Sequence, residues 1–330
     1  MKIIAEILSI VILLAGMASC AKTDRIYDDG RTEIAMRPVM SVMPKAPVTG
    51  TEYPAGASFG VNAYYSSDYS HGQEWTSVSS VQPYLEKRKF VREGETFSGD
   101  PDCYWPHAGS LVFVGYSPYE AVSDFSFDLD DLILRIDNFN SDDQPDLMYF
   151  LPELSDGSLK GLNTSTTPVS ASFNHALSLV SFDMQVREGD EDDIKLKKII
   201  LKDMYATGNF TVLASDPATA AWTRTSDASD ITVFNSDAGQ GLSPSVPVDV
   251  LVIPGEAVVM QIVYETKFYD MTQSAVVTKD LTAEIVPSEV GVTTWQTGKK
   301  YLYDVVIEAN KIEVIPSTDY IGVIEKESQK

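Results

Sequence analysis

The chain has few of the residues from which reactive or metal-binding sites are usually built. Its 330 residues include two cysteines and three histidines. Because His71, His107 and His175 stand far apart, none of the usual spacings of a zinc site is present. The sequence also lacks a phosphate loop, a dinucleotide glycine fingerprint and a nucleophile elbow. These absences argue against an enzyme and against a metal or organic cofactor.

Basic residues are scarce as well. The chain has 25 Lys and Arg against 48 Asp and Glu, which gives a formal net charge of -23. A nucleic-acid surface needs clustered basic side chains to neutralise phosphates, so a nucleic-acid partner is excluded. An acidic surface suits a soluble body at a cell surface. The one basic cluster indicates either a solvated strand edge, because charged edges discourage unwanted sheet pairing, or a partner to an acidic surface. It consists of Lys87, Arg88, Lys89 and Arg92.

The longest apolar run stands at the start of the chain. It follows Lys2 and extends almost without interruption from Ile3 to Met17. The run is short for a bilayer span and lacks a basic stop-transfer flank, so it predicts a signal peptide over residues 1–19. The segment Met17-Ala18-Ser19-Cys20 resembles a bacterial lipobox, in which the cysteine is acylated and becomes the new N-terminus. This predicts a lipid anchor in the outer membrane, with a plain secretory signal as the alternative.

Lipidation of Cys20 would leave one cysteine in the mature body. An internal disulfide is then impossible, and stability must come from packing. The remaining Cys103 lies in the aromatic, proline-containing segment Cys103-Tyr104-Trp105-Pro106-His107. This context favours a packing or turn role over a nucleophile.

No convincing long amphipathic helix interrupts the rest of the chain. Short apolar or alternating runs recur between clusters of Gly, Pro, Asp, Ser and Asn, which is typical of an all-β sandwich protein. About 311 residues after the signal suggest two domains. The polar stretch Leu154–Thr167 is the best linker or long loop, so we expect domains over 46–167 and 168–330. The predicted strands lie within 58–65, 111–116, 147–150, 177–186, 195–201, 210–213, 248–253, 258–264, 274–277 and 301–307.

Two groups of side chains leave binding functions open. An oxygen-rich cluster offers the ligands that calcium takes, but it lacks the loop glycine and the final glutamate of a helix-loop-helix site, so a solvated turn is favoured. Six aromatic residues could form a sugar platform, although aromatics in sandwich strands more often pack in the core. The cluster consists of Asp137, Asn138, Asn140, Asp142, Asp143 and Asp146, and the aromatic set of Tyr53, Tyr64, Tyr65, Tyr69, Trp75 and Tyr84.

Several short phrases occur at intervals along the chain. In order they are the polar tether Lys22–Gly30, Phe59-Gly60-Val61, Tyr104-Trp105-Pro106, Leu111-Val112-Phe113-Val114-Gly115-Tyr116, Asp146-Leu147-Met148-Tyr149, Phe173-Asn174-His175-Ala176-Leu177 and Trp295-x-x-Gly298-x-x-Tyr301-x-Tyr303. Taken in this order, the phrases resemble the fimbrillin family, the pilin precursors of Bacteroidales type V pili, including its minor-fimbrium-like branch. The resemblance implies two transthyretin-like or Ig-like β-sandwich domains in tandem and a role in building surface filaments.

A weak strand follows the tether, and the resemblance implies that it is removable. Pro38 forbids one ladder hydrogen bond, which suits an edge strand that must leave. The resemblance also implies that a trypsin-like or Arg/Lys-specific protease cuts after a basic residue beyond this strand. Lys45, before Ala46, occupies the matching place, so residues 20–45 would be the tether and removable strand. The alternative cut sites are Arg31 and Arg25. The strand's apolar face consists of Ile34, Met36, Met40 and Val42.

The C-terminal tail has two readings that the sequence leaves open. Its short β-prone runs either insert into the groove of another pilin subunit by strand addition or form ordinary final strands. The leading hypothesis is therefore a structural, tip or accessory fimbrial subunit, with a surface ligand if it is an adhesin. The alternative is a non-polymerising surface lipoprotein that binds glycans or host ligands. The candidate donor residues are Ile312, Val314, Tyr320 and Ile324.

Overall fold

The computed structural model describes residues 31–40, 53, 56–309 and 311–320. Within these ranges the chain is all-β, with three short 3₁₀ turns and no α-helix, so the predicted class is confirmed. No helix of the described ranges is long and apolar enough to cross a membrane. The 3₁₀ turns are η1 (Tyr119–Ala121), η2 (Thr164–Thr166) and η3 (Pro287–Val290).

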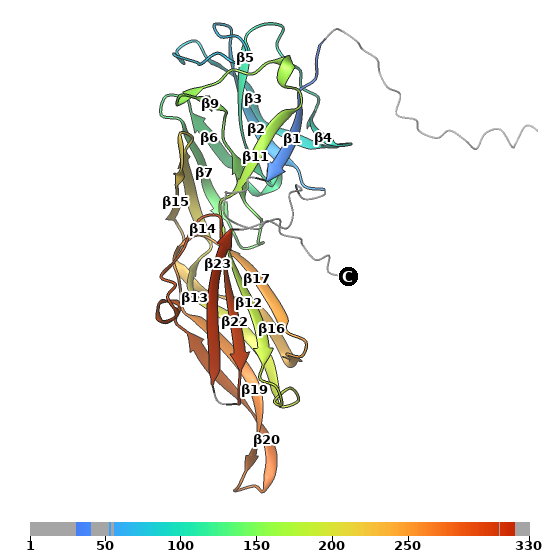
Figure 1. Cartoon of the computed structure of the whole chain (residues 1–330), viewed down its shortest axis with the longest axis vertical. Helices are drawn as coiled ribbons and strands as arrows, with labels where there is room; N and C mark the ends of the chain where they lie inside the picture. Colours follow the sequence, from blue (N-terminus) through green and yellow to red (C-terminus); the bar gives the residue numbers. More distant parts are fainter. Residues whose placement is uncertain (1–30, 41–52, 54–55, 310, 321–330) are drawn as a thin grey trace, which may run out of the picture. The chain divides into compact units, whose positions relative to one another are not determined.

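The first half of the chain builds a closed sheet of seven strands (Figure 1). All neighbouring strands are antiparallel except the first in sequence and its partner, which are parallel. Its first strand joins both ends of the sheet, so an open two-sheet sandwich in the first half stays a prediction. In order around the sheet the strands are β1 (Ala35–Met40), β11 (Val169–His175), β8 (Met148–Phe150), β5 (Ser110–Ser117), β2 (Phe59–Ser66), β3 (Gln82–Glu93) and β4 (Thr96–Asp100).

Glycine is required where this sheet packs most tightly. A Cβ atom on Gly60 would lie 2.2 Å from the ring of Tyr116. A Cβ atom on Gly115 would lie 2.2 Å from the ring of Phe150. Gly60 and Tyr116 are also Cα partners in the β2–β5 register. The phrase Phe59-Gly60-Val61 therefore reflects a place where aromatic rings take the space of a missing side chain.

A four-stranded sheet packs against the first half and crosses the expected boundary at residue 167. Its strands β14 and β15 come late in the chain, yet β14 pairs with β7, and Phe210 lies opposite Ile136. Both side chains are buried in one cluster with Tyr116 and Tyr149. Division of the chain into 46–167 and 168–330 stays a prediction, but the strand pairing does not follow it. The strands, in order, are β15 (Asp216–Arg224), β14 (Thr207–Leu213), β7 (Ile133–Asn140) and β6 (Asp124–Asp128).

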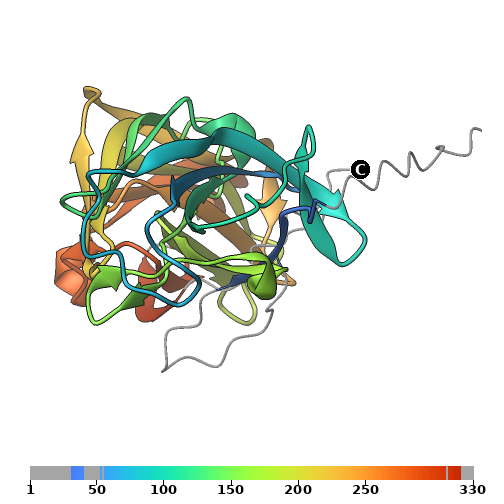
Figure 2. The same ribbon diagram turned by 90° about the horizontal axis from the view of Figure 1, so that it is seen from above.

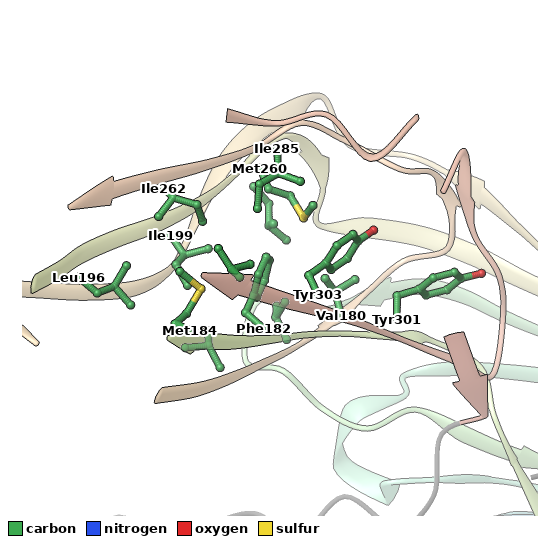
Figure 3. Packing of buried hydrophobic residues seen from close by; sticks show 14 of the residues in the cluster. Val180, Phe182, Met184, Leu196, Ile199, Met260, Ile262, Ile285, Tyr301 and Tyr303 are labelled. Atoms are coloured by element: carbon green, nitrogen blue, oxygen red, sulfur yellow. The ribbon is translucent and has the colours of Figure 1, made fainter. Parts of the chain in front are cut away.

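Two further four-stranded sheets enclose the core of the second half (Figure 3). Phe182 of β12 and Tyr303 of β22 stack with ring centroids 5.8 Å apart, facing Ile199 and Ile262 from the other sheet. The strand predicted within 301–307 is confirmed, and buried residues alternate along it. One sheet contains β17 (Val246–Val252), β12 (Ser178–Val186), β22 (Lys299–Ile307) and β23 (Ile312–Tyr320), and the other β16 (Ala228–Gly241), β13 (Ile194–Tyr205), β19 (Met260–Asp270) and β20 (Ala275–Ile285).

Short strands complete the fold. The polar stretch predicted as a linker or long loop carries a small hairpin and lies against β5, where Leu162 and Leu111 exchange two backbone hydrogen bonds of 2.8 Å. It is therefore a packed loop of the first half. The short strands are β9 (Leu154–Ser155), β10 (Ser158–Leu159), β18 (Gly255–Glu256) and β21 (Thr294–Trp295).

Candidate functional site

The first strand, β1, closes the seven-stranded sheet. It pairs with β11 in parallel from Met36 to Met40, and with β4 only at Ala35 and Met36. The dark-blue β1 can be followed beside the yellow-green β11 in two views (Figures 1 and 2). The predicted edge strand is therefore an edge over part of its length, because β1 has two neighbours only at its start. From Arg37 onward it has a neighbour on one side only.

One face of β1 seals the core of the closed sheet. Ile34 and Met36 are fully buried, and Met40 is 8% exposed, whereas Arg37 is exposed. The alternation predicted for these residues is confirmed; Val42 lies outside the described residues. Fully burying an apolar side chain of this size stabilises the fold by about 1.5–3 kcal/mol. Loss of β1 would uncover these contacts and leave a substantial apolar groove.

Pro38 lies inside the stretch of β1 that is paired on one side. Its Cα partner on β11 is Ala171, a fully buried residue. Since proline has no N–H, β1 cannot donate a ladder hydrogen bond at this position. The strand thus combines a well-buried side-chain face with an incomplete backbone ladder.

The segment around Cys103 holds the start of β1. The backbone N–H of Ile34 donates to the carbonyl of Cys103 over 2.9 Å, and Glu33 forms a bridge with Tyr104. Cys103 itself is 6% exposed, and burial raises the pKa of its thiol to about 11. The reactive form of cysteine is the thiolate, so this residue packs as a neutral thiol, as its sequence context indicated.

Tyr53 lies in the same core as β1, beyond the undescribed residues 41–52. Its ring contacts Phe59 and Phe97 edge to face, with centroids 5.7 and 5.4 Å away. Its hydroxyl is 2.5 Å from the hydroxyl of Ser117, and burial raises its pKa well above the usual range. The backbone carbonyl of Tyr53 also accepts a 3.4 Å hydrogen bond from Arg92. The chain is therefore fixed in the core on both sides of residues 41–52.

The candidate processing residues fall in different places relative to these two fixed points. Lys45 and Ala46 lie between β1 and Tyr53 in the sequence, whereas Arg25 and Arg31 precede β1. Arg31 is exposed. The other three residues, and the proposed lipidation site Cys20, lie outside the described residues.

The C-terminal strand β23 is the last strand of its sheet. It pairs with β22 in antiparallel fashion from Ile312 to Tyr320. Ile312 and Val314 are half-buried against the sandwich core, and Ile315 is 59% exposed. In this form of the chain β23 is thus an ordinary final strand. The backbone of Tyr320 belongs to it, and Ile324 lies outside the described residues.

The oxygen-rich cluster is spread over turns and a buried contact. The Asn140 amide donates to Asp142 over 3.2 Å, and Asn138 donates to Asp124 over 3.1 Å. The Asp146 carboxylate is 2.8 Å from Nδ1 of His175, inside the fold. Among the described residues no group of three or more His, Cys, Asp or Glu side chains is placed to hold a metal.

The basic cluster lies on β3, where Arg88 is paired with β2 alone, Arg92 with β4 alone and Lys89 with both neighbours. Lys87 donates to the carbonyl of Ser123 over 2.6 Å, and Lys89 pairs with Glu120 over 2.6 Å. Arg92 lies 5.0 Å from the ring centroid of Phe97. These cations are engaged by the fold, so they do not form a binding patch.

The six aromatic residues do not form a sugar platform. Tyr53 and Trp75 are both 4% exposed, and the indole of Trp75 donates to Ser110 over 3.1 Å. Tyr69 stacks on Trp75, with ring centroids 6.0 Å apart. Tyr84 is the most exposed of the set at 38%. The set is therefore divided between core packing and the surface.

Three of the family-like phrases meet at one place, which the sequence did not indicate. His175 contacts Asp146, the Ala176 N–H donates to Leu147, and the Gly298 N–H donates to the carbonyl of Leu177 over 2.9 Å. A cavity of about 520 Å³ adjoins this meeting point. Its lining comes from five separate segments of the chain, so no single run of residues in the sequence predicts it. Among the residues that line it are Tyr149, Asn174, Trp222, Trp295 and Gln296.

Comparison with known proteins shows which family and which solved structures this chain resembles. The sequence model of a family described as fimbrillin-like matches residues 48–318. A search of curated proteins finds no match. Among solved structures, a proposed cell adhesion protein from Bacteroides uniformis is similar, with 17% identity, a TM-score of 0.54, and coverage of 89% of this chain and 98% of that one. A fimbrial protein from Bacteroides vulgatus has 15% identity, a TM-score of 0.53, and coverage of 88% and 99%.

Proposed function

Because this chain belongs to the fimbrillin-like family, we propose that it is a structural, tip or accessory subunit of a cell-surface fimbria, with a role in adhesion. In this proposal the chain is exported as a lipoprotein acylated at Cys20 and held at the outer membrane. A protease then cuts after Lys45, and the subunit joins other pilin subunits by exchange of a donor strand. The finer architecture that belongs to the proposal is a tandem of transthyretin-like or Ig-like sandwiches.

The observation that carries this proposal is the construction of β1. The strand fills a groove whose walls are β11 and β4, and it covers buried aromatic rings such as Phe97 and Phe173. Its removal would leave unpaired backbone groups on β11 beside an apolar groove. A strand of another protein can satisfy both at once, as in strand addition to an open sheet edge.

The order of the chain favours one cut site. Cleavage after Arg25 or Arg31 would leave β1 joined to the body, because both precede it. Cleavage after Lys45 separates β1 from the body and leaves Tyr53 on the body side. Tyr53 then holds the new N-terminal segment in the core through its ring contacts and its hydrogen bond to Ser117. A single cut at Lys45 would therefore release both the lipid anchor and β1.

Trypsin treatment of the purified precursor tests this function. We expect a stable product that begins at Ala46, followed by a ladder of species that resists SDS. The Lys45→Gln precursor is the matched control, and it should stay uncut at this bond and monomeric. A precursor that is degraded without a stable product, or a product that never forms a ladder, would remove the basis for polymerisation.

A second candidate function is glycan binding by a non-polymerising surface lipoprotein. The cavity beside Trp222 favours it, since ligand pockets of about 300–1,000 Å³ combine apolar walls with a few polar groups. Asn174 and Gln296 supply such groups here. A glycan array with the intact chain and with Trp222→Ala tests this reading. Hits that disappear in the variant support it, and an array without hits counts against it.

A further inference from the structure

We propose that two copies of this chain pair through the free edge of β20, in antiparallel fashion, with Leu281 of each copy opposite Leu281 of the other. This contact goes beyond the proposed function, because it uses the second half of the chain and needs neither a cut nor an exchanged strand. It is two-fold, so it makes a closed pair rather than a growing chain. On a cell surface it would hold two subunits, or the two filaments that contain them, side by side.

The edge of β20 is long, regular and unpaired. β20 is the last strand of its sheet, and no strand of the described residues pairs with its outer edge. On its other side it pairs with β19 along all eleven residues without a bulge, and it contains no proline. The hairpin of β19 and β20 can be followed in Figure 1. Such an edge presents a row of free N–H and C=O groups, which can pair with another strand.

The other edges of the three four-stranded sheets are interrupted. The edge strands β15, β17 and β23 each contain a proline. On β17, the side chain of Gln144 also bonds to both the N–H of Leu251, over 2.6 Å, and its carbonyl, over 3.1 Å. The register of β16 against β13 shifts at three places, and β6 has only five residues. Natural proteins block exposed edges in these ways. Within the described ranges, β20 is therefore the edge of these sheets that remains open to a partner.

The sequence along this edge is an approximate palindrome about Leu281. Residues 276–286 read Val-Val-Thr-Lys-Asp-Leu-Thr-Ala-Glu-Ile-Val. Residues directly opposite in an antiparallel pair lie on the same face, with Cβ atoms about 4.5–5.5 Å apart. Two copies centred on Leu281 put Val276 of one opposite Val286 of the other. The edge is thus complementary to a second copy of itself.

The inner face of β20 would gain burial from this pairing. Ile285 lies beside Met260 in the core of the second half (Figure 3). Toward the end of the hairpin the core stops: Leu281 is half-buried, and Phe268 on β19 is 43% exposed. Val277 is the Cα partner of Phe268, and the proposed register puts Val277 opposite Ile285 of the second copy. The apolar face of the partner would therefore continue the core where it now ends.

Charge selects this register over its neighbours. Like charges directly opposite each other destabilise a strand pair. A two-fold pair centred on Asp280 would put this carboxylate opposite itself, and one centred on Lys279 would do the same with its ammonium group. A pair centred on Thr282 would put Asp280 opposite Glu284. In the pair centred on Leu281, Asp280 lies opposite Thr282, and no two like charges lie directly opposite.

The contact is small, because each copy contributes one strand edge. Its area falls at the low end of specific interfaces, about 1,200 Å² in total or less. The formal net charge of -23 on each chain also opposes association, and salt screens this repulsion. We therefore expect a reversible dimer whose fraction rises with protein concentration and with salt.

Sedimentation velocity over a concentration series tests the pairing. The full chain carries Lys45→Gln, so that strand exchange cannot contribute, and Cys20→Ser. Thr282→Lys should strengthen the dimer, because it puts an ammonium group opposite Asp280, and Thr282→Glu should weaken it by putting a carboxylate there. Each contact occurs twice in a two-fold pair, so the dissociation constant should change by about two- to thirtyfold in either direction.

A matched control separates this contact from a general effect of charge. Thr282 is exposed, so neither substitution should disturb the fold. Thr223 is exposed on another edge strand, β15, and Thr223→Glu changes the net charge as much as Thr282→Glu does. This control should leave the dissociation constant close to that of the parent chain. A chain that stays monomeric at every concentration, or a dimer that neither Thr282 variant affects, would overturn the proposal.

Disulfide trapping on the outer face measures the register. Asp280 and Thr282 are both exposed, and the proposed pair puts Asp280 of one copy opposite Thr282 of the other. Directly opposite residues lie within the Cα separation that a disulfide spans. A mixture of Asp280→Cys chains and Thr282→Cys chains, both in the background without Cys20, should therefore give a covalent dimer on oxidation. Neither chain alone should give one, since Cys103 is buried.

The single-cysteine chains identify the alternatives. A covalent dimer of the Asp280→Cys chain alone would indicate a pair centred on Asp280, and one of the Thr282→Cys chain alone a pair centred on Thr282. Either result would overturn the proposed register. Chains that associate but give no covalent dimer in the mixture would overturn the contact through β20. The cut after Lys45 is tested on the unsubstituted chain, so its failure would leave these results unaffected.

Discussion

The strands β1 and β23 share an interior proline and a similar apolar spacing, yet the fold treats them differently. β1 closes a sheet, and Met36 on it is fully buried. β23 ends a sheet, and Val314 on it is half-buried, while Ile315 remains 59% exposed. Two similar segments therefore differ in how deeply the fold buries them. In the proposed function, the better-buried strand is the one that a cut after Lys45 separates from the body.

The largest difference should appear when each strand loses its central apolar side chain. We expect Met36→Ala to lower the free energy of unfolding of the precursor by about 2–5 kcal/mol, because it leaves a cavity in the closed core. Val314→Ala should cost clearly less, since this side chain is half-buried. Urea denaturation of the two variants measures the difference. Equal losses would mean that β1 is no better anchored than β23.

The alkylation rate of the Cys103 thiol measures how well β1 shields the core of the closed sheet. Its pKa of about 11 leaves on the order of one thiolate per thousand thiols at pH 8, so alkylation of the precursor should be slow and should quicken as the pH rises toward that value. Because the Cys103 carbonyl holds Ile34, removal of β1 should expose the thiol and raise its rate at pH 8. Mass spectrometry of the alkylated chain follows both rates. Equal rates before and after the cut would show that β1 does not shield this core.

A smaller effect is expected at Tyr53, the other fixed point of the first core. Tyr53→Phe keeps the ring contacts and removes the hydrogen bond to Ser117, which should cost about 1 kcal/mol. Ser117→Ala is the matched control, and the double variant should cost less than the sum of the two single changes. Additive losses would mean that the two hydroxyls do not interact in solution.

The smallest effect is expected on the outer face of the two strands. Arg37→Ser on β1 and Ile315→Ser on β23 change exposed side chains, so each should alter the free energy of unfolding by less than about 0.5 kcal/mol. The same denaturation series measures them. A large loss for either variant would place the wrong face of that strand toward the core.

Local patterns predicted which face of each strand is buried, but not what each strand pairs with. The alternation of Ile34, Met36 and Met40 is a property of neighbouring residues, and it was read correctly. The sequence does not predict the closure of the sheet, because β1 pairs with Val169 and its neighbours, far along the chain. The same reason explains why β14 was assigned to the second half, although it pairs with β7. Pairing between distant segments produces no periodic pattern in the sequence of either segment.

The candidate site shows the same limit. Aromatic composition near Trp75 favoured core packing and left a surface platform open; the side chain packs inward and donates to Ser110, a partner 35 residues away. The meeting of His175, Asp146 and Gly298 was equally hidden, although the phrases that contain them were each recognised. The sequence shows each of these phrases separately, but it does not predict that they contact one another.

The N-terminal residue of the protein isolated from assembled surface filaments tests the account most directly. If β1 is removed to open the groove, sequencing should find Ala46 at the start of the chain, and residues 20–45 should be absent from the filament. A filament subunit that still begins at Cys20 would retain β1 in its core. That result would contradict the exchange of β1 for another strand.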